Sequence, residues 1–318
     1  MIVVTGAAGF IGSCLIAKLN ALGINKIIAV DKFQDSKKSL NIKGKAIDEK
    51  VDRDDFFTWL NKTKSEIEII YHLGARTDTL ENDNRIFKLL NLEYSKRIWK
   101  YCSSKQIPLV YASSAAVYGN GQLGFSDNHE LTPRLKALNP YGQSKLDFDN
   151  WVLSQGHCPP NWIGLRFFNV FGPNESHKGR MASMVYQLYR QVVMNQKIRL
   201  FKSHKKQFEH GEQSRDFIYV KEVINVALQL QHSKATGIFN VGSGNDLTFN
   251  LIADIIFNEA GVKPQIEYID MPTKIRRSYQ YQTKASLDKL MSYDIATNGT
   301  AEGIQEYISH YLSASNHW

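Results

Sequence analysis

The chain has 318 residues, 43% of them hydrophobic and 22% charged, which is typical of a soluble globular protein long enough for two compact units. No apolar run is long enough to span a bilayer and the start has no cationic leader, so we expect a cytoplasmic protein without membrane contact. A formal net charge of +8 would attract anionic ligands such as nucleic acid, nucleotide sugars or phosphorylated cofactors. Because Cys14, Cys102 and Cys158 are odd in number and far apart, neither a disulfide framework nor a metal site is expected.

The first thirty residues have the pattern of a strand, a helix and a second strand. An apolar run predicts a strand over Ile2–Thr5, and the spacing of apolar residues predicts a helix over Phe10–Leu22. Gly23 is a favoured residue just past a helix end, and the next apolar run predicts a strand over Lys26–Val30. This order is that of one βαβ unit.

The turn between the first strand and the helix has the glycine spacing of a dinucleotide site. A pyrophosphate needs backbone amides and no side chain in its way, which explains Gly6, Gly9 and Gly12. Asp31, 19 residues beyond Gly12, is placed to accept hydrogen bonds from an adenosine ribose. Three nearby cations could instead hold a 2′-phosphate: Lys32, Lys38 and Arg53. We expect NADP, with NAD as the alternative, and solvated loop lysines as the alternative for the first two cations.

The chain then alternates strands and helices. Strands are expected at Ile67–Tyr71, Pro108–Ala112 and Trp162–Phe167, and helices near Asn84–Ser104 and Tyr141–Ser154. This alternation predicts an α/β fold, a Rossmann-type doubly wound parallel sheet with right-handed crossovers.

After Gly172 and Pro173 the pattern changes. We expect a helix at Met181–Met194 and a strand at Ile198–Phe201, followed by a polar insertion as far as Ser214. Two further strands, at Phe217–Tyr219 and Ile238–Val241, are expected to return to the main sheet. Helices are expected at Asn250–Ala260 and Ala301–Tyr311. The predicted division is a dinucleotide-binding domain over residues 1–170, joined again by about 216–243, and a smaller α/β substrate-binding domain over 171–215 and 244–318.

Residues 141–145 contain a Tyr and a Lys four positions apart, with a Ser upstream. Tyr141 and Lys145 would share one helical face, so the ammonium would favour the phenolate and let the Tyr move a proton near neutral pH. Ser114 could hold the substrate oxygen. A surface Tyr and Lys on an amphipathic helix would have the same spacing, but the glycine turn and the Ser favour catalysis.

The segment after the Ile67–Tyr71 strand is expected at the ligand-binding edge of the sheet. Leu73, Gly74 and Ala75 follow its end, where doubly wound sheets bind ligands. Asn91 could hydrogen-bond toward the cofactor, although a helix-surface Asn is the alternative. Phe10, Ile11, Val170 and Lys145 complete the expected cofactor-binding set.

Together these residues resemble the extended short-chain dehydrogenase/reductase superfamily over nearly the whole chain. The segment LRFFNVFGP at 165–173 and the segment RDFIYV at 215–220 are similar to signatures of members that act on nucleotide sugars. The segment ESHKGRMAS at 175–183 resembles the HKGxMAS segment of the ADP-L-glycero-D-manno-heptose 6-epimerase family of lipopolysaccharide precursor synthesis. Also similar to that family are MIVVTGAAGFIGS at the start, YASSAAVYG, Leu200-Phe201 and Arg276-Arg277-Ser278-Tyr279-Gln280.

This resemblance implies an isomerase that inverts C6 of the heptose in ADP-D-glycero-D-manno-heptose. Since that carbon bears no acidic hydrogen, inversion needs transient oxidation with a tightly bound nicotinamide cofactor. The resemblance implies two acid/base residues, Tyr141 and Lys178, one for each epimer, with a loop lysine that pairs with the diphosphate as the alternative for Lys178. It also implies a substrate-binding set of Ser114, Asn169, Arg180, Gln187, Phe201, Arg215 and Tyr279. Arg215 suits a diphosphate, and a structural pair with Asp216 is its alternative.

Three other functions fit parts of the sequence. A UDP-hexose 4-epimerase would share the glycine turn, Ser114, Tyr141 and Lys145, but would not need Lys178. A 4,6-dehydratase needs a carboxyl group after the Ser, where this chain has Ala115 and Ala116. A non-catalytic dinucleotide- or RNA-binding relative would use the positive charge but not a tuned phenol. We therefore expect an ADP-sugar as the partner and a homo-oligomer, with neither nucleic acid nor a membrane bound.

Overall fold

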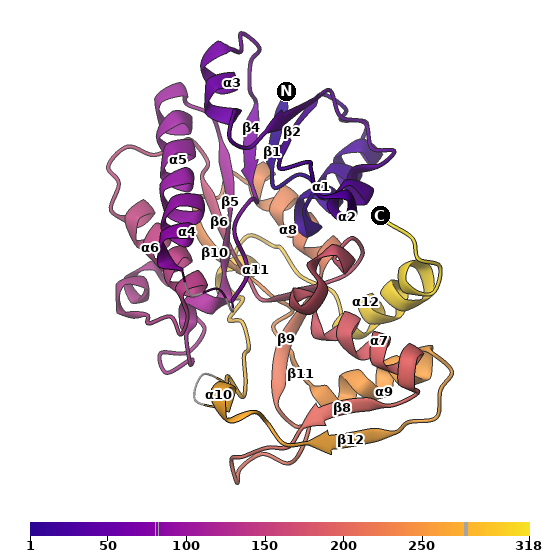
Figure 1. Cartoon of the computed structure of the whole chain (residues 1–318). Helices are drawn as coiled ribbons and strands as arrows, with labels where there is room; N and C mark the ends of the chain where they lie inside the picture. Colours follow the sequence, from indigo (N-terminus) through magenta and orange to yellow (C-terminus); the bar gives the residue numbers. More distant parts are fainter. Residues whose placement is uncertain (80, 82, 277–278) are drawn as a thin grey trace.

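The computed structural model describes residues 1–79, 81, 83–276 and 279–318, and its centre is a seven-stranded sheet (Figure 1). The strands are β1 Ile2–Thr5, β2 Ile27–Asp31, β3 Glu49–Asp52, β4 Ile69–His72, β5 Leu109–Ser114, β6 Ile163–Phe167 and β10 Gly237–Val241. Their order is β10-β6-β5-β4-β1-β2-β3, and every neighbouring pair is parallel. The predicted doubly wound parallel sheet is confirmed.

Helices cover both faces of this sheet, because its central strands are apolar on both sides. Along β1, Val4 packs in the cluster that contains α1 (Phe10–Ala21) and α8 (Val220–His232). The neighbouring Val3 packs in the cluster that contains three helices on the opposite face: α3 Phe56–Lys62, α5 Tyr94–Lys105 and α6 Pro140–Leu153. Figure 1 shows these two groups on opposite sides of the sheet.

Several elements were not predicted from the sequence. They are α2 Ser36–Ser39, η1 Leu40–Ile42, β3, α3 and α8. In β3 only Val51 is buried, so the strand has no apolar alternation to reveal it. The helix expected near Asn84–Ser104 consists of α4 Asn84–Phe87, a π-helical turn η2 Lys88–Glu93, and α5.

The prediction that two later strands return to the main sheet is right for only one of them. Strand β10 pairs with β6 and occupies its open edge. The other strand, β9 (Ser214–Tyr219), instead pairs in a three-stranded sheet with β7 (Asn169–Phe171) and β11 (Asp246–Thr248). Since β10 already fills the edge of β6, β9 runs beside β7, which follows β6 directly in the chain.

Most of the remaining elements lie at the carboxyl ends of the central strands, below the main sheet in Figure 1. Strand β8 (Ile198–Phe201) pairs with β12 (Ile266–Ile269). The helices here are η5 Ser176–Met181, α7 Met184–Asn195, α9 Phe249–Glu259, α10 Thr273–Arg276, α12 Thr300–Glu306 and η6 Tyr307–Leu312. The 3₁₀ helix η3 Ala115–Tyr118 directly follows β5, whereas η4 His129–Arg134 and α11 Asp288–Met291 contact Ile238 at the beginning of β10. The division into cofactor and substrate domains remains a prediction.

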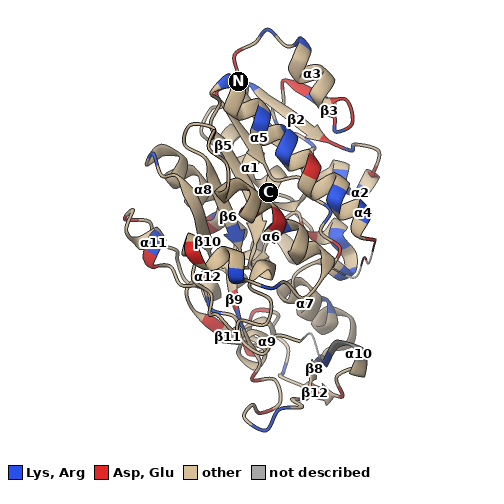
Figure 2. Cartoon of the chain, turned by 90° about the vertical axis from the view of Figure 1, so that its left-hand side faces the viewer, with Lys and Arg blue, Asp and Glu red and all other residues tan. Residues whose placement is uncertain are grey.

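Charged side chains are spread over many elements. In Figure 2, Lys and Arg occur on separated elements such as α5 and α2 and are interspersed with Asp and Glu. None of the helices in the described parts of the chain combines the length and apolar character needed to cross a bilayer. Across the same residues, no group of three or more His, Cys, Asp and Glu could hold a metal ion.

Candidate active site

Two adjoining cavities lie where the strands of the main sheet end. The larger has a volume of about 1070 Å³, and the smaller, of about 420 Å³, lies against the glycine turn. They share the lining residues Phe10, Ile11, Leu73, Ala75, Thr77, Lys178 and Met181. A ligand bound at the glycine turn could therefore extend directly into the larger cavity.

The glycine turn has no room for side chains. Gly6 has a φ of +70°, and a Cβ there would lie 2.7 Å from the Cα atom of Gly74. A Cβ at Gly12 would lie 2.2 Å from the carbonyl oxygen of Gly6. Helix α1 begins here, with Gly9 as an N-cap that provides no side-chain acceptor. Its first N–H groups thus remain available to an anion such as a pyrophosphate, so the turn fits a dinucleotide.

The predicted ribose acceptor, Asp31, is already fixed by three donors. Its Oδ2 atom accepts from the N–H of Ala8 at 2.9 Å. Its Oδ1 atom accepts from the N–H of Lys32 at 2.7 Å and from Lys38 Nζ at 2.5 Å. The carboxylate thereby holds the glycine turn, and the ion pair with Lys38 offsets its negative charge.

The other two cations predicted to bind a 2′-phosphate line the smaller cavity, but both have acidic partners. Lys32 Nζ lies 3.0 Å from Asp52 and 2.5 Å from Asp54, and these carboxylates raise its pKa. Arg53 Nε lies 3.4 Å from Asp54. Of the three predicted cations, Lys38 is the one whose charged side chain pairs with Asp31.

The segment after β4 lies partly in the cavities. Leu73, Gly74 and Ala75 line the smaller cavity, and Val170 lines the larger. Asn91 lines neither, because the π-helical turn directs it into the protein, where it is buried. Its side chain hydrogen-bonds the N–H and the carbonyl of Arg76 and the hydroxyl of Ser144, so its observed contacts are structural.

Tyr141, Lys145 and Ser114 come together in the larger cavity, as the sequence predicts. Asn139 caps helix α6 by accepting from the N–H of Gly142 at 2.8 Å, which places Tyr141 in the first turn. Burial raises the pKa of Tyr141, and its hydrogen bond to Ser114 acts in the opposite direction. Burial lowers the pKa of Lys145 to about 8, and its Nζ donates to the carbonyl of Ala112 at 2.8 Å. Burial thus favours the phenol of Tyr141 over the expected phenolate, whereas Lys145, with a pKa of about 8, remains largely an ammonium at neutral pH.

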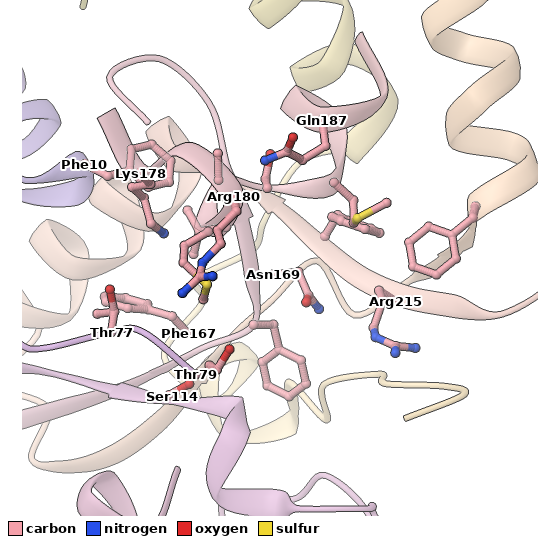
Figure 3. Close-up of a pocket in the computed structure, with 18 of the residues that line it drawn as sticks. Phe10, Thr77, Thr79, Ser114, Phe167, Asn169, Lys178, Arg180, Gln187 and Arg215 are labelled. Atoms are coloured by element: carbon pink, nitrogen blue, oxygen red, sulfur yellow. The ribbon is translucent and has the colours of Figure 1, made fainter. Parts of the chain in front are cut away.

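Lys178 reaches the junction of the two cavities from the short helix η5. Figure 3 shows its side chain extending into the pocket from one side, with Ser114 on the other. Burial lowers the pKa of Lys178, and Glu175 acts in the opposite direction. Within the described residues its Nζ has no hydrogen bond or ion pair, and the ring of Phe10 lies 5.6 Å away. The lowered pKa of Lys178 thus comes from burial. Arg180, in the same short helix, is mostly exposed and pairs with Asp78.

Glu175 fixes the loop of Lys178, and the sequence did not reveal this role. Its fully buried carboxylate accepts from the N–H of Gly172 at 3.1 Å, the hydroxyl of Ser183 at 2.8 Å and the N–H of Ser183 at 2.5 Å. Ser183 also caps helix α7 by accepting from the N–H of Tyr186. The two ends of the loop are thereby joined through one side chain. No residue spacing points to such a contact.

All the predicted substrate-binding residues line the larger cavity: Ser114, Asn169, Arg180, Gln187, Phe201, Arg215 and Tyr279. Gln187 donates to the carbonyl of Gly179 at 2.7 Å, and Asn169 donates to that of Asp216 at 2.8 Å. The rings of Phe201 and Tyr279 meet edge to face. Arg277 and Ser278 lie outside the described residues.

Arg215 is held among aromatic rings. Its guanidinium lies 5.2 Å from the ring of Tyr279 and 5.8 Å from that of Phe249, and it donates to the carbonyls of Ser214 and Gln280. Burial lowers its pKa. It is not paired with Asp216, whose carboxylate accepts from Ser243, Gly244 and Ala285. The structural ion pair between Arg215 and Asp216 is therefore absent, so the Asp216 carboxylate does not compete with an anion that binds Arg215.

Known proteins resemble this chain over almost its whole length. Residues 2–242 match the NAD dependent epimerase/dehydratase family. The chain is 40% identical to the ADP-L-glycero-D-manno-heptose-6-epimerase of Fusobacterium nucleatum, with 98% of both chains covered. It is 39% identical to the corresponding protein of Nitratidesulfovibrio vulgaris, with 99% of both covered.

Solved structures agree with these matches. The ADP-L-glycero-D-manno-heptose-6-epimerase of Helicobacter pylori superposes with a TM-score of 0.80 at 28% identity and covers 97% of this chain and 95% of that one. The UDP-glucose 4-epimerase of Thermus thermophilus in complex with NAD has a TM-score of 0.79 at 24% identity, covering 98% and 99%, and shares the fold. The chain belongs to the NAD dependent epimerase/dehydratase family and, within it, to the ADP-L-glycero-D-manno-heptose-6-epimerases.

Proposed function

We propose that the chain inverts C6 of the heptose in ADP-D-glycero-D-manno-heptose to give the ADP-L-glycero form. The observation on which this depends is that Tyr141 and Lys178, two candidate acid/base groups, line one cavity adjoining the glycine turn. The names of the relatives at about 40% identity support the substrate. A role in lipopolysaccharide core precursor synthesis follows from that substrate.

The chemistry explains why two acid/base groups are needed. The C6–H bond of the sugar is not acidic, so inversion requires that the C6 alcohol become a carbonyl and be reduced again from the other face. A nicotinamide dinucleotide supplies the reversible hydride acceptor when it is bound. If the intermediate turns in the site, its oxygen needs a proton partner in each of two orientations.

The protonation states in the site favour one assignment of roles. Burial favours the neutral amine of Lys178 and the neutral phenol of Tyr141. Lys178 is then the base that takes the C6 hydroxyl proton, and Tyr141 is the acid that returns a proton to the turned oxygen. Ser114, which lines the same cavity as Tyr141, orients that oxygen. In the reverse direction the two roles exchange.

The bound diphosphate and the cofactor would be held by other residues. Arg215 lies among aromatic rings, and among the described residues its guanidinium has no ion pair with a carboxylate, which suits the ADP diphosphate. Gly6, Gly9 and the start of α1 would hold the cofactor pyrophosphate, and Lys145 the ribose nearest the reacting carbon. We infer NADP rather than NAD because Lys38 offsets the charge of Asp31, where a 2′-phosphate would lie. The remaining cofactor-site predictions, a cytoplasmic location and a homo-oligomer also belong to this proposal.

The test is incubation of the purified protein with the pure D-glycero epimer and no added cofactor, followed by chromatography. Appearance of the L-glycero product supports the proposal, and its absence from protein shown to hold a nicotinamide dinucleotide rejects it. UDP-glucose is tested in parallel. Formation of UDP-galactose instead would favour the 4-epimerase alternative. Binding measurements with NADP and NAD decide the cofactor, because a tighter complex with NAD would contradict the inferred role of Lys38.

A further inference from the structure

One buried amide group ties the loop of Lys178 to the glycine turn. We propose that Asn41 is a positioning residue that holds Lys178 at the junction of the two cavities. The inference rests on the proposed function, because it requires that Lys178 act on the substrate. It assigns a role to a residue that lines neither cavity and that no sequence pattern singled out.

The contacts of Asn41 link two distant segments of the chain. Asn41 lies in η1 and is fully buried. Its Nδ2 atom lies 3.0 Å from the carbonyl of Ala8, inside the glycine turn, and 3.0 Å from the carbonyl of Asn174, at the start of the Lys178 loop. One amide hydrogen of Asn41 is thus donated to the glycine turn and the other to the Lys178 loop.

The neighbouring histidines fit this arrangement. His177 Nδ1 lies 2.9 Å from the carbonyl of Asn174 and 3.1 Å from Asn41 Nδ2. Since both hydrogens of Asn41 have acceptors, Nδ1 is assigned as the protonated nitrogen of His177, donating to Asn174. His317 Nδ1 lies 3.1 Å from Asn41 Oδ1, so the carbonyl end of the amide also has a partner. Every polar atom of Asn41 therefore has a partner that fixes its orientation.

Both sides of the link are rigid. The N–H of Ala8 donates to Asp31, so the Ala8 peptide is held at its N–H and at its carbonyl. On the other side, the N–H of Lys178 donates to the carbonyl of Glu175, one residue after Asn174. Loss of the Asn41 amide would leave in place the Glu175 contacts and the hydrogen bond from Asn174 Nδ2 to Ser13 on α1, but would remove the direct link between the loop and the glycine turn. We expect Lys178 then to sample positions away from the cavity junction.

The test compares Asn41→Leu, which keeps the approximate volume without an amide, with the matched control Asn20→Leu. The side chain of Asn20 also donates hydrogen bonds to two backbone carbonyls, those of Ile24 at 3.1 Å and Ala46 at 3.0 Å, but it has no contact with the Lys178 loop. We expect kcat of the Asn41 variant to fall about 30-fold with KM changed less than about threefold, because misplacing a catalytic group slows the chemical step more than it weakens binding. The Asn20 control should keep kcat within about twofold of the wild type.

A second readout does not depend on activity. Pulse labelling of the intact protein with acetic anhydride, read by peptide mass spectrometry, reports how accessible and how basic the Lys178 amine is. Lys178 should be labelled about 10-fold faster in the Asn41 variant, relative to exposed lysines, and unchanged in the control. If Asn41→Leu does not fold, Asn41→Asp replaces it, since Asp keeps the shape and loses the two hydrogens.

The outcomes separate this inference from the proposed function. Wild-type protein without epimerase activity would reject the function, whatever the labelling shows. An active wild type, with Asn41 and Asn20 variants alike in kcat and in Lys178 labelling, would overturn the role of Asn41 alone. A rise in KM with unchanged kcat would also overturn it, because that pattern indicates weaker binding rather than a misplaced base.

Discussion

The two candidate acid/base groups are held in the site in different ways. Tyr141 lies in the first turn of the 14-residue helix α6, and its neighbour Ser114 is the last residue of strand β5. Lys178 lies in the six-residue helix η5, in which Gly179 interrupts the helical backbone with a φ of +54°. Regular secondary structure positions the first group. Buried side-chain contacts of Glu175 and Asn41 position the second.

This difference predicts which distant residues matter. Around Tyr141, the backbone hydrogen bonds of α6 and one N-cap fix the geometry, so few side chains outside the site should affect it. Around Lys178, the buried residues Glu175 and Asn41 replace the missing regular structure. Substitutions far from the reacting carbon should therefore impair Lys178 more than Tyr141.

The largest effect is expected from Tyr141→Phe, which removes the phenolic proton while keeping the ring. We expect kcat for epimerisation to fall about 10³-fold, in the range for loss of a general acid or base, with little change in the unfolding temperature. The check is the rate of L-glycero product formation together with a thermal melt. Turnover within tenfold of the wild type would show that another group donates this proton.

A somewhat smaller loss is expected from Lys178→Met. Removal of the amine leaves space at the cavity junction that water can fill in part, so we expect kcat to fall about 10²-fold. Lys100→Met, at an exposed position on α5, is the matched control and should behave like the wild type. Near-normal turnover by Lys178→Met would refute the two-base scheme even if the activity itself is as proposed.

Glu175→Gln tests whether the loop contacts support Lys178. The change replaces an acceptor facing the N–H groups of Gly172 and Ser183 with an amide that can present hydrogens to them. We expect a loss of about 1–3 kcal/mol in the free energy of unfolding, as for a buried unsatisfied group, and about a 10-fold lower kcat. Urea denaturation and initial rates are the measurements, with the exposed Glu130→Gln as the control. An unchanged unfolding free energy would show that the Glu175 contacts are dispensable.

The smallest effect concerns pH. Because burial lowers the pKa of Lys178 below its usual 10.5, the neutral amine becomes available as pH rises through that lowered value, and the rate should rise with it. Lys178→Met should lose this rising limb while Asn41→Leu should shift it upward, as the amine becomes more solvated. A pH profile of kcat for the three proteins is the check. A rising limb that survives in Lys178→Met would assign it to another group.

The sequence predicts the Tyr141 side of the site well for a physical reason. The glycine turn, the apolar strands and the YxxxK helix are local patterns, and a parallel sheet brings their ends to one edge. The same logic places the substrate-binding residues around one cavity.

Long-range side-chain contacts are what the sequence could not predict. Asn91 was expected near the cofactor, but a π-helical turn directs it inward to Arg76 and Ser144. The contacts of Glu175 and Asn41 join segments that no spacing relates. The pKa of Tyr141 was expected to fall beside Lys145, whereas burial, visible only in three dimensions, raises it.

The most direct test of the proposed chemistry follows the hydrogen at C6. A turnover of the D-glycero epimer is run in D₂O, and the isotope at C6 of the L-glycero product is read by mass spectrometry and NMR. Transient oxidation with return of the same hydride predicts that C6 retains its original hydrogen. Deuterium at C6 of the inverted product would mean that the carbon exchanged a proton with solvent, and would contradict the account.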